Sequence, residues 1–238
     1  ILSYGTLLLM VVLSVISPVA ASIFLFLVII SLLVKAVGIA IRTIQGSSIM
    51  LKAQEVNWHK RLESLQNPKK SYAEIKNLHK NEFQWKDYLN ELKYISRHST
   101  DFPKPSDIYN AIIIATYNES YDILQPTVQS VLDTTYSNDH IILVIAYEER
   151  GGADTEKTVK RLQEEYKDKF FAFEIVKHPK DLPNEVIGKG GNITYAGRFL
   201  QKWLRDKQIK SEDVIVTTLD SDNRPFYSYF DCLTYQFI

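Results

Sequence analysis

The sequence predicts an α/β protein with a doubly wound, mostly parallel sheet that follows a membrane-spanning helical segment. Three observations support this prediction: a long uncharged opening, four apolar runs rich in β-branched residues, and helical stretches that alternate with those runs. The runs are apolar at successive positions, which is typical of strands that are covered on both faces. The runs are Ala111–Ala115, Ile141–Ala146, Phe171–Val176 and Val214–Leu219, and the helical stretches are about Leu124–Leu132, Thr155–Tyr166 and Asn192–Asp206.

The opening segment from Ile1 to Val34 contains no charged side chain. As one helix it would be about 50 Å long, whereas the hydrocarbon core of a bilayer is about 30 Å thick. Proline lacks a backbone donor and disfavours helical geometry in the residue before it, so we expect a break at Ser17–Pro18. The prediction is a hairpin, with a first span up to about Ser17 and a second from about Pro18 to Ile41. The alternative is a single kinked helix.

Basic residues follow this apolar segment. Between Lys35 and Lys80 there are nine Lys or Arg residues and three Asp or Glu residues. A cleaved signal peptide carries its basic residues before the apolar stretch, so this order disfavours one. The positive-inside rule places the basic flank, and everything after it, in the cytosol. We therefore expect a multi-pass protein of the cell (plasma) membrane with a cytosolic domain.

We expect three parts along the chain: transmembrane helices in residues 1–44, a cytosolic amphipathic helical linker in residues 45–108, and the α/β domain in residues 109–238. In the linker, aromatic and leucine side chains between Trp58 and Tyr94 recur at roughly helical spacing among charged ones. This pattern fits amphipathic helices that pack on the domain or lie at the membrane surface.

Composition argues against several classes of function. The 28 Lys and Arg residues balance the 28 Asp and Glu residues, so no overall field would attract nucleic acid. The single cysteine, Cys232, cannot form an internal disulfide, and the five histidines lack the spacing of a zinc site. A Walker loop and a Gly-x-Gly-x-x-Gly motif after the first strand are both missing, which disfavours an ATPase and a dinucleotide oxidoreductase.

Polar residues follow the predicted strands at the edge of the sheet where open α/β sheets bind ligands. Asp220 and Asp222 come directly after the fourth strand, and two carboxylates at this spacing suit Mg²⁺ or Mn²⁺ bridging phosphates. Lys189 lies between glycines at the start of a helix, where an ammonium and backbone N–H groups favour a diphosphate. Asp is also a common turn residue, and a lysine in a glycine turn is commonly just solvated.

Three motifs together resemble the family 2 glycosyltransferases, which have a GT-A fold. They are Ile-Ile-Ile-Ala-Thr-Tyr-Asn-Glu (112–119), Gly-Lys-Gly-Gly-Asn (188–192) and Thr-Leu-Asp-Ser-Asp (218–222). The resemblance covers about Tyr109 to Ile238, and the apolar hairpin is similar to that of membrane-bound bacterial members. It implies a GT-A-like sheet whose Rossmann-like half binds a nucleotide, here the donor-binding part of a domain that is incomplete at its C-terminus.

The resemblance also implies roles for individual residues. Those implied to bind the donor are Thr116, Tyr117, Glu119, Glu148, Lys189, Gly190, Asn192 and Asp220, and those implied to bind Mg²⁺ or Mn²⁺ are Asp220 and Asp222. In this comparison the loop after the first strand frames the nucleoside, while Lys189 and Asn192 lie by the diphosphate. Many members read the base with an Asp-Asp pair, whereas this chain has Glu148-Glu149. The identity of the nucleotide therefore stays open, with a UDP-sugar favoured.

The family's catalytic base, an Asp or Glu in a later motif, has no counterpart in this chain, and neither has the Gln-x-x-Arg-Trp motif of processive synthases. We expect the base beyond Ile238 and a natural chain that is longer at both ends. On this expectation the 238 residues alone have no transferase turnover, although they could retain weak donor binding. Asp231, in the last predicted helix, is a weak candidate for the base.

The expected activity is transfer of a sugar from a nucleotide-diphosphate sugar to a polysaccharide or lipid acceptor at the cytosolic membrane face. The resemblance implies a metal-dependent reaction that inverts the anomeric carbon. The alternative is a non-catalytic, membrane-anchored module that binds a nucleotide sugar or acts as a scaffold.

Overall fold

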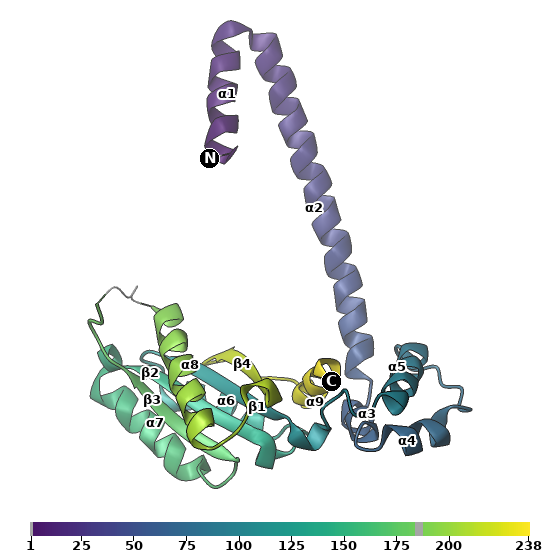
Figure 1. The fold of residues 1–238 in the computed structure, drawn as a ribbon. Helices are drawn as coiled ribbons and strands as arrows, with labels where there is room; N and C mark the ends of the chain where they lie inside the picture. The colour runs from purple at the N-terminus through teal and green to yellow at the C-terminus, as the bar shows by residue number, and fades with distance from the viewer. Residues whose placement is uncertain (1, 184–187) are drawn as a thin grey trace. The chain divides into compact units, whose positions relative to one another are not determined.

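The computed structural model describes residues 2–183 and 188–238. Contacts divide the chain after Val56 into two compact units, Ile1–Val56 and Asn57–Ile238 (Figure 1). We call them the N-terminal unit and the C-terminal unit.

The N-terminal unit consists of two helices that pack against each other, α1 (Leu2–Ile16) and α2 (Pro18–Gln54) (Figure 1). Ser17 between them has an extended backbone, and its hydroxyl accepts a hydrogen bond from the N–H of Ala20 at 3.4 Å, which caps α2. The predicted break at Ser17–Pro18 is thus confirmed, and the alternative of one kinked helix is wrong. The helical backbone of α2 continues past Ile41, where we expect the second membrane span to end, as far as Gln54.

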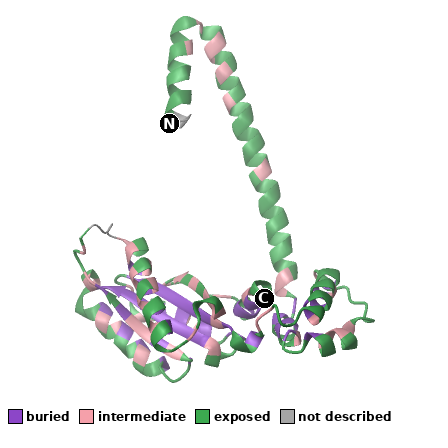
Figure 2. Cartoon of the chain, in the orientation of Figure 1, coloured by how far each residue is buried: buried purple, intermediate pink, exposed green. Residues whose placement is uncertain are grey.

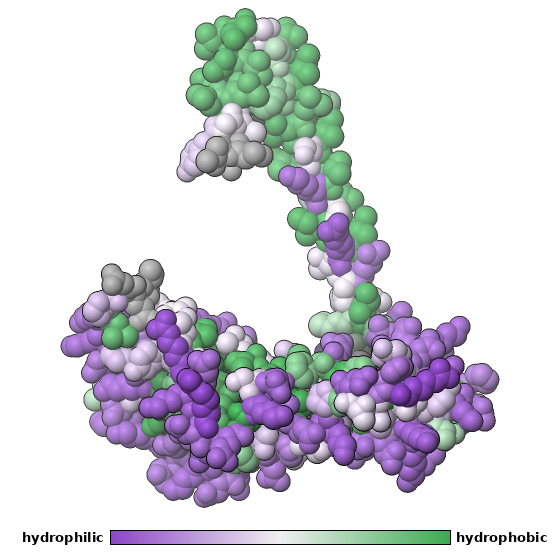
Figure 3. Space-filling view, viewed as in Figure 1, coloured by the Kyte–Doolittle hydropathy of each residue, from purple (hydrophilic) through white to green (hydrophobic). Residues whose placement is uncertain are grey.

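The side chains of this unit are mostly apolar and exposed (Figures 2 and 3). No residue of α2 is buried, and the most apolar 18-residue window of this helix has a mean hydropathy of 2.8. Exposed apolar surface on this scale is unfavourable in water, at about 25 cal/mol per Å². Among the described helices, α2 is the one whose length and composition allow it to cross a membrane.

The C-terminal unit contains one sheet of four parallel strands in the order β3-β2-β1-β4. The strands are β1 (Tyr109–Thr116), β2 (Ile141–Glu148), β3 (Ala172–His178) and β4 (Val214–Asp220). The chain moves from β1 outward to β3 and then crosses to the other side of β1. The order therefore reverses between β1 and β4, and the carboxyl ends of these two strands are the expected ligand position.

Helices cover both faces of this sheet, as the sequence predicts. Helix α8 (Lys189–Asp206) packs through Ala196 and Leu200 on one face of β1 and β2 (Figure 1). Helices α6 (Tyr121–Leu132) and α7 (Gly152–Tyr166) contact each other, and α7 also packs on β2 and β3. Because side chains alternate along a strand, the buried residues of β1 and β2 serve both layers.

One strand differs from the prediction. We expected all four strands to be covered on both faces, but β4 has alternating burial, and Val216 is 53% exposed. Its run Val214–Leu219 includes Thr217 and Thr218, whereas the runs Ala111–Ala115 and Ile141–Ala146 of the inner strands are apolar throughout. Its exposure follows from its place at the edge of the described sheet, which a local pattern does not encode.

The remaining helices of this unit flank the sheet. They are α3 (Trp58–Ser64), α4 (Pro68–Ile75), α5 (Trp85–Arg97) and α9 (Tyr229–Phe237), with 3-10 turns at Pro105–Asp107, Asn138–His140, Glu149–Gly151 and Ser211–Asp213. An aromatic cluster joins three of them, since the Tyr235 ring lies 5.6 Å from Trp58 and 6.2 Å from Tyr88 between centroids. Buried Arg61 lies over the rings of Trp58 and Tyr88 at 5.2 and 4.8 Å. Helices α3 and α5 thus pack on the α/β domain through α9.

We expect Leu92→Ala to lower the free energy of unfolding of the C-terminal unit by about 2–5 kcal/mol, because it removes a fully buried side chain from α5. Chemical denaturation followed by circular dichroism measures this change. The matched control is Leu78→Ala, at a site that is 45% exposed, which should have little effect. Equal stabilities of the two variants would show that α5 is not part of the cooperative unit.

Candidate donor site at the carboxyl edge of the sheet

A cavity of about 340 Å³ lies where β1 and β2 end and α8 begins. Its lining includes residues that the sequence assigns to the donor, namely Thr116, Tyr117, Glu119, Glu148, Lys189 and Asn192. An ion pair between Lys189 and Asp220 joins this cavity to the end of β4. Residues from three strand ends and one helix start thus meet at the point where the strand order reverses.

The loop after β1 is shaped by the carboxylate of Glu119. One of its oxygens accepts hydrogen bonds from the Thr116 hydroxyl at 2.5 Å and from the N–H groups of Tyr117 at 2.7 Å and Asn118 at 3.2 Å. Burial by itself would raise the pKa of Glu119, but these hydrogen bonds outweigh it, and the pKa lies below the usual value. Glu119 is therefore ionised and holds the loop, while the Tyr117 side chain is left 43% exposed.

The low pKa of Glu119 predicts a pH-dependent contribution to stability. A carboxyl group whose pKa falls on folding stabilises the protein above its unfolded pKa of about 4.3, and loses that effect as pH falls through the folded pKa. We expect wild type to have a higher Tm than Glu119→Gln at pH 7, and the gap to close below about pH 4. Thermal unfolding between pH 7 and pH 3 measures it. A gap of constant size would show that the charge of Glu119 is not involved.

The two glutamates after β2 point to different partners. Glu148 is buried, lines the cavity and pairs with Arg150. Glu149 instead accepts a hydrogen bond from the N–H of Lys180 at 3.1 Å and lies 3.6 Å from the ammonium of Lys177. Glu148 is thus the one that can meet a ligand in this cavity.

Arg150 is a cavity residue that the sequence analysis did not identify. Its guanidinium lies 5.3 Å from the centroid of the Tyr117 ring, close enough for a cation-π contact. The next residue, Gly151, packs against the same loop, and a Cβ there would clash with the carbonyl oxygen of Tyr117. The glycine was a visible signal, but a tight backbone approach cannot be read from sequence alone.

The start of α8 is fixed to the sheet by Asn192. Its side-chain amide donates to the carbonyl oxygens of Ala146 at 2.9 Å and Thr116 at 3.2 Å, and so ties α8 to the ends of β2 and β1. The side-chain oxygen of Asn192, Oδ1, is buried and has no hydrogen-bond partner among the described residues. Gly188, with φ of 143°, precedes the helix in a conformation that favours glycine, and Lys189 and Gly190 form the first turn.

The acidic turn follows β4. Asp220 ends the strand opposite Ala115 of β1, and its carbonyl oxygen accepts a hydrogen bond from the N–H of Asn223 at 3.1 Å. Asp222 lies inside this turn and is exposed. In the described part of the chain, no group of three or more His, Cys, Asp or Glu side chains forms a ready metal site. A cation here would need ligands from a phosphate in addition to the two aspartates.

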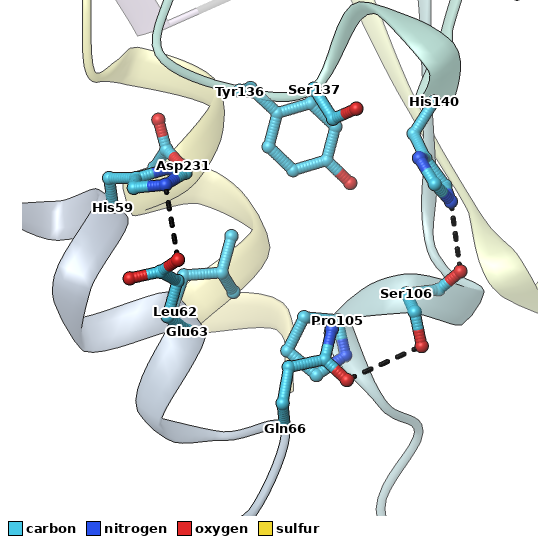
Figure 4. Close-up of a pocket in the computed structure, with 10 residues that line it drawn as sticks. All are labelled: His59, Leu62, Glu63, Gln66, Pro105, Ser106, Tyr136, Ser137, His140 and Asp231. Atoms are coloured by element: carbon cyan, nitrogen blue, oxygen red, sulfur yellow. Dashed lines mark hydrogen bonds and ion pairs between the residues drawn. The ribbon is translucent and has the colours of Figure 1, made fainter.

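A second cavity, of about 240 Å³, lies at the opposite edge of the sheet, beside the segments that lead into β1 and β2 (Figure 4). Asp231 is fully buried at this cavity, where it lies 2.9 Å from Nδ1 of His59 and accepts a hydrogen bond from the Thr135 hydroxyl at 2.5 Å. These contacts fix α9 to α3 and place Asp231 at the edge of the sheet opposite the first cavity. Next to it, burial raises the pKa of the Cys232 thiol to about 11, which leaves no reactive thiolate.

Comparisons with known proteins give a match to a sequence family and matches to four chains of solved structures, one of which is described here. No curated protein sequence matches the chain. One matching solved structure is a mannosyltransferase, PcManGT from Pyrobaculum calidifontis, in complex with GDP-Man and Mn²⁺. It is 19% identical, the match covers 72% of this chain and 43% of that chain, and the TM-score is 0.39. The described chain thus spans less than half of that protein.

The family match covers the segment from β1 to just past β3. It therefore includes the loop around Glu119 and the end of β2, but neither Lys189 nor Asp220. Residues 111–182 match the family described as Glycosyl transferase family 2.

Proposed function

We propose that the protein is a glycosyltransferase that binds a nucleotide-diphosphate sugar in the cavity at the carboxyl edge of its sheet. The observation that carries the proposal is the ion pair of Lys189 with Asp220, where the sheet order reverses. It puts a group suited to a diphosphate beside a group suited to its metal ion. The family match over residues 111–182 supports the same class of enzyme.

In this proposal the cavity binds the donor in two halves. The exposed ring of Tyr117 and the carboxylate of Glu148 contact the nucleoside, and we favour a UDP-sugar. The ammonium of Lys189 and the N–H groups in the first turn of α8, including that of Gly190, contact the diphosphate. Asn192 brings these two halves together through its bonds to β1 and β2.

Asp220 and Asp222 are the proposed ligands of Mg²⁺ or Mn²⁺. Their carboxylate oxygens are the hard donors that such ions prefer, and the ion pair of Asp220 with the Lys189 ammonium supports a cation position at this carboxylate. When bound, the ion would neutralise negative charge that develops on the leaving diphosphate. Lys189 would stabilise the same charge.

The proposed reaction is attack of an acceptor hydroxyl on the anomeric carbon, from the face opposite the diphosphate, with inversion. The bond from the sugar to the diphosphate breaks as the new glycosidic bond forms, and a base takes the proton of the hydroxyl. We assign no described residue as this base. The proposed acceptor is a polysaccharide or a lipid at the cytosolic membrane face. Helix α2 would anchor the protein in the cell membrane, with the basic flank in the cytosol.

Isothermal titration of the full 238-residue chain in detergent tests the proposal. We expect UDP to bind in the presence of Mn²⁺, to bind more weakly with EDTA, and to bind more tightly than GDP. Absence of any binding by either nucleotide, with a cooperatively folded protein, would refute the proposed donor site. Tight binding of GDP alone would keep the site and overturn the preference for uridine.

A further inference from the structure

The acidic turn is held by a buried side chain that neither the motifs nor the cavity lining includes. The carbonyl oxygen of Ser221, between the two proposed metal ligands, accepts a hydrogen bond from the hydroxyl of Thr127 at 2.7 Å. Thr127 lies in α6 and is fully buried. Its bond fixes the residue whose backbone connects Asp220 to Asp222, whereas the other bond of the turn, from Asn223 to Asp220, lies within the turn itself.

Helix α6 is a firm support for this contact. Tyr166 of α7 accepts a hydrogen bond from Gln125 at 2.7 Å and donates one to Gln129 at 2.9 Å, so it fixes α6 on both sides of Thr127. The helix begins at Tyr121, just after the loop that Glu119 shapes. The same helix therefore follows the proposed nucleoside loop and holds the proposed metal turn.

The hydroxyl of Thr127 does not bond within its own helix, as helical threonines commonly do. Serine and threonine in helices commonly donate to a carbonyl oxygen three or four residues earlier in the same helix, as Ser130 does to Thr127 at 2.7 Å. Thr127 instead donates across to the turn. After the turn, a further hydrogen bond joins Tyr227 to the segment that follows α6, since the Tyr227 carbonyl oxygen accepts from the N–H of Thr135 at 2.8 Å. Asp222 lies between these two anchors, next to the first.

From this geometry we infer that Thr127 is a positioning residue for the divalent cation of the donor site. Its hydroxyl sets the direction of the turn, so that both aspartates present their oxygens to one ion. Groups that orient metal ligands without touching the metal commonly change metal affinity by about 10–100-fold. The inference rests on the proposed function, because it needs a metal ion at Asp220 and Asp222.

The test compares two variants. Thr127→Val keeps the shape of the side chain but loses the hydroxyl that donates the hydrogen bond, whereas Thr127→Ser keeps that hydroxyl. Titration of Mn²⁺ into the full chain with saturating UDP should show a loss of affinity of about tenfold for the valine variant and none for the serine variant. The matched control is Thr134→Val, since Thr134 is also buried but bonds to the nearby carbonyl of Val131. It should keep the wild-type affinity for Mn²⁺.

A double-mutant cycle separates positioning from a general loss of structure. If Thr127 acts through the metal ligands, Thr127→Val should reduce Mn²⁺ affinity in wild type and have no further effect in Asp222→Asn. If the valine variant folds poorly, the measurement is repeated with Thr127→Ala. Alanine also lacks the hydroxyl and has a high helix propensity. The inference would be overturned if a folded variant without the Thr127 hydroxyl kept the wild-type affinity for Mn²⁺ while Asp222→Asn lost affinity for Mn²⁺. The proposed function would then remain intact. No metal-dependent binding by wild type would instead overturn the proposed function.

Discussion

Asp222→Asn should lower the affinity for UDP in the presence of Mn²⁺ by about 100-fold, which corresponds to about 2.7 kcal/mol. Asparagine has nearly the same shape as aspartate but no charge, so the change removes one hard anionic ligand and little else. Binding without metal should barely change, because Asp222 is exposed and forms no part of the lining of the donor cavity. Titration with UDP in Mn²⁺ and in EDTA measures both quantities.

The control for this variant is Asp206→Asn, at an exposed aspartate at the far end of α8. It removes the same charge from the protein without altering the acidic turn. If both variants bind UDP equally well in Mn²⁺, Asp222 is not a metal ligand, and the assignment of the turn is wrong.

Lys189→Met should weaken UDP by about 10–100-fold and leave uridine nearly unaffected, because the ammonium meets the diphosphate and not the nucleoside. The pair that Lys189 forms with Asp220 is about half exposed on both sides. Such pairs contribute only about 0–1 kcal/mol, so little is lost when a phosphate replaces the carboxylate as partner. In the same variant, Asp220 is free of its cation, and the affinity for Mn²⁺ without nucleotide should not fall.

The ratio of UDP to uridine affinity is the deciding measurement for Lys189. Lys202→Met, at an exposed site on the same helix, controls for the loss of one positive charge. A proportional loss for UDP and uridine would mean that Lys189 supports the fold of the loop. Wild-type affinities for both UDP and uridine in Lys189→Met would remove Lys189 from the diphosphate site.

Much of the sheet could be predicted because each strand is a local apolar run and each helix a local pattern. The position of β4 at the edge could not be predicted, because the exposure of Val214–Leu219 depends on neighbours elsewhere in the chain. The sequence also left open whether the linker helices pack on the domain or lie at the membrane surface. The packing of α3 and α5 on α9 depends on contacts between residues far apart in the sequence, such as Trp58 and Tyr235.

The candidate site was predictable to a similar depth. Lys189 and Asp220 could be identified as a helix start and a strand end, and the structure places them in contact. Which of Glu148 and Glu149 faces the cavity depends on the direction of the backbone at the strand end. Thr127 gives no signal at all in the sequence, because a buried threonine in a helix is ordinary until its partner is known.

Both ion pairs of the donor cavity, Glu148 with Arg150 and Lys189 with Asp220, join a fixed anion to a fixed cation. These paired charges are therefore balanced, and so are the diphosphate of a nucleotide sugar and its divalent ion. Binding of the ligand therefore exchanges counterions, because each charged side chain replaces its partner in the protein with a charged group of the ligand. This exchange leaves no buried charge unpaired, so the pocket needs no large rearrangement to bind its ligand.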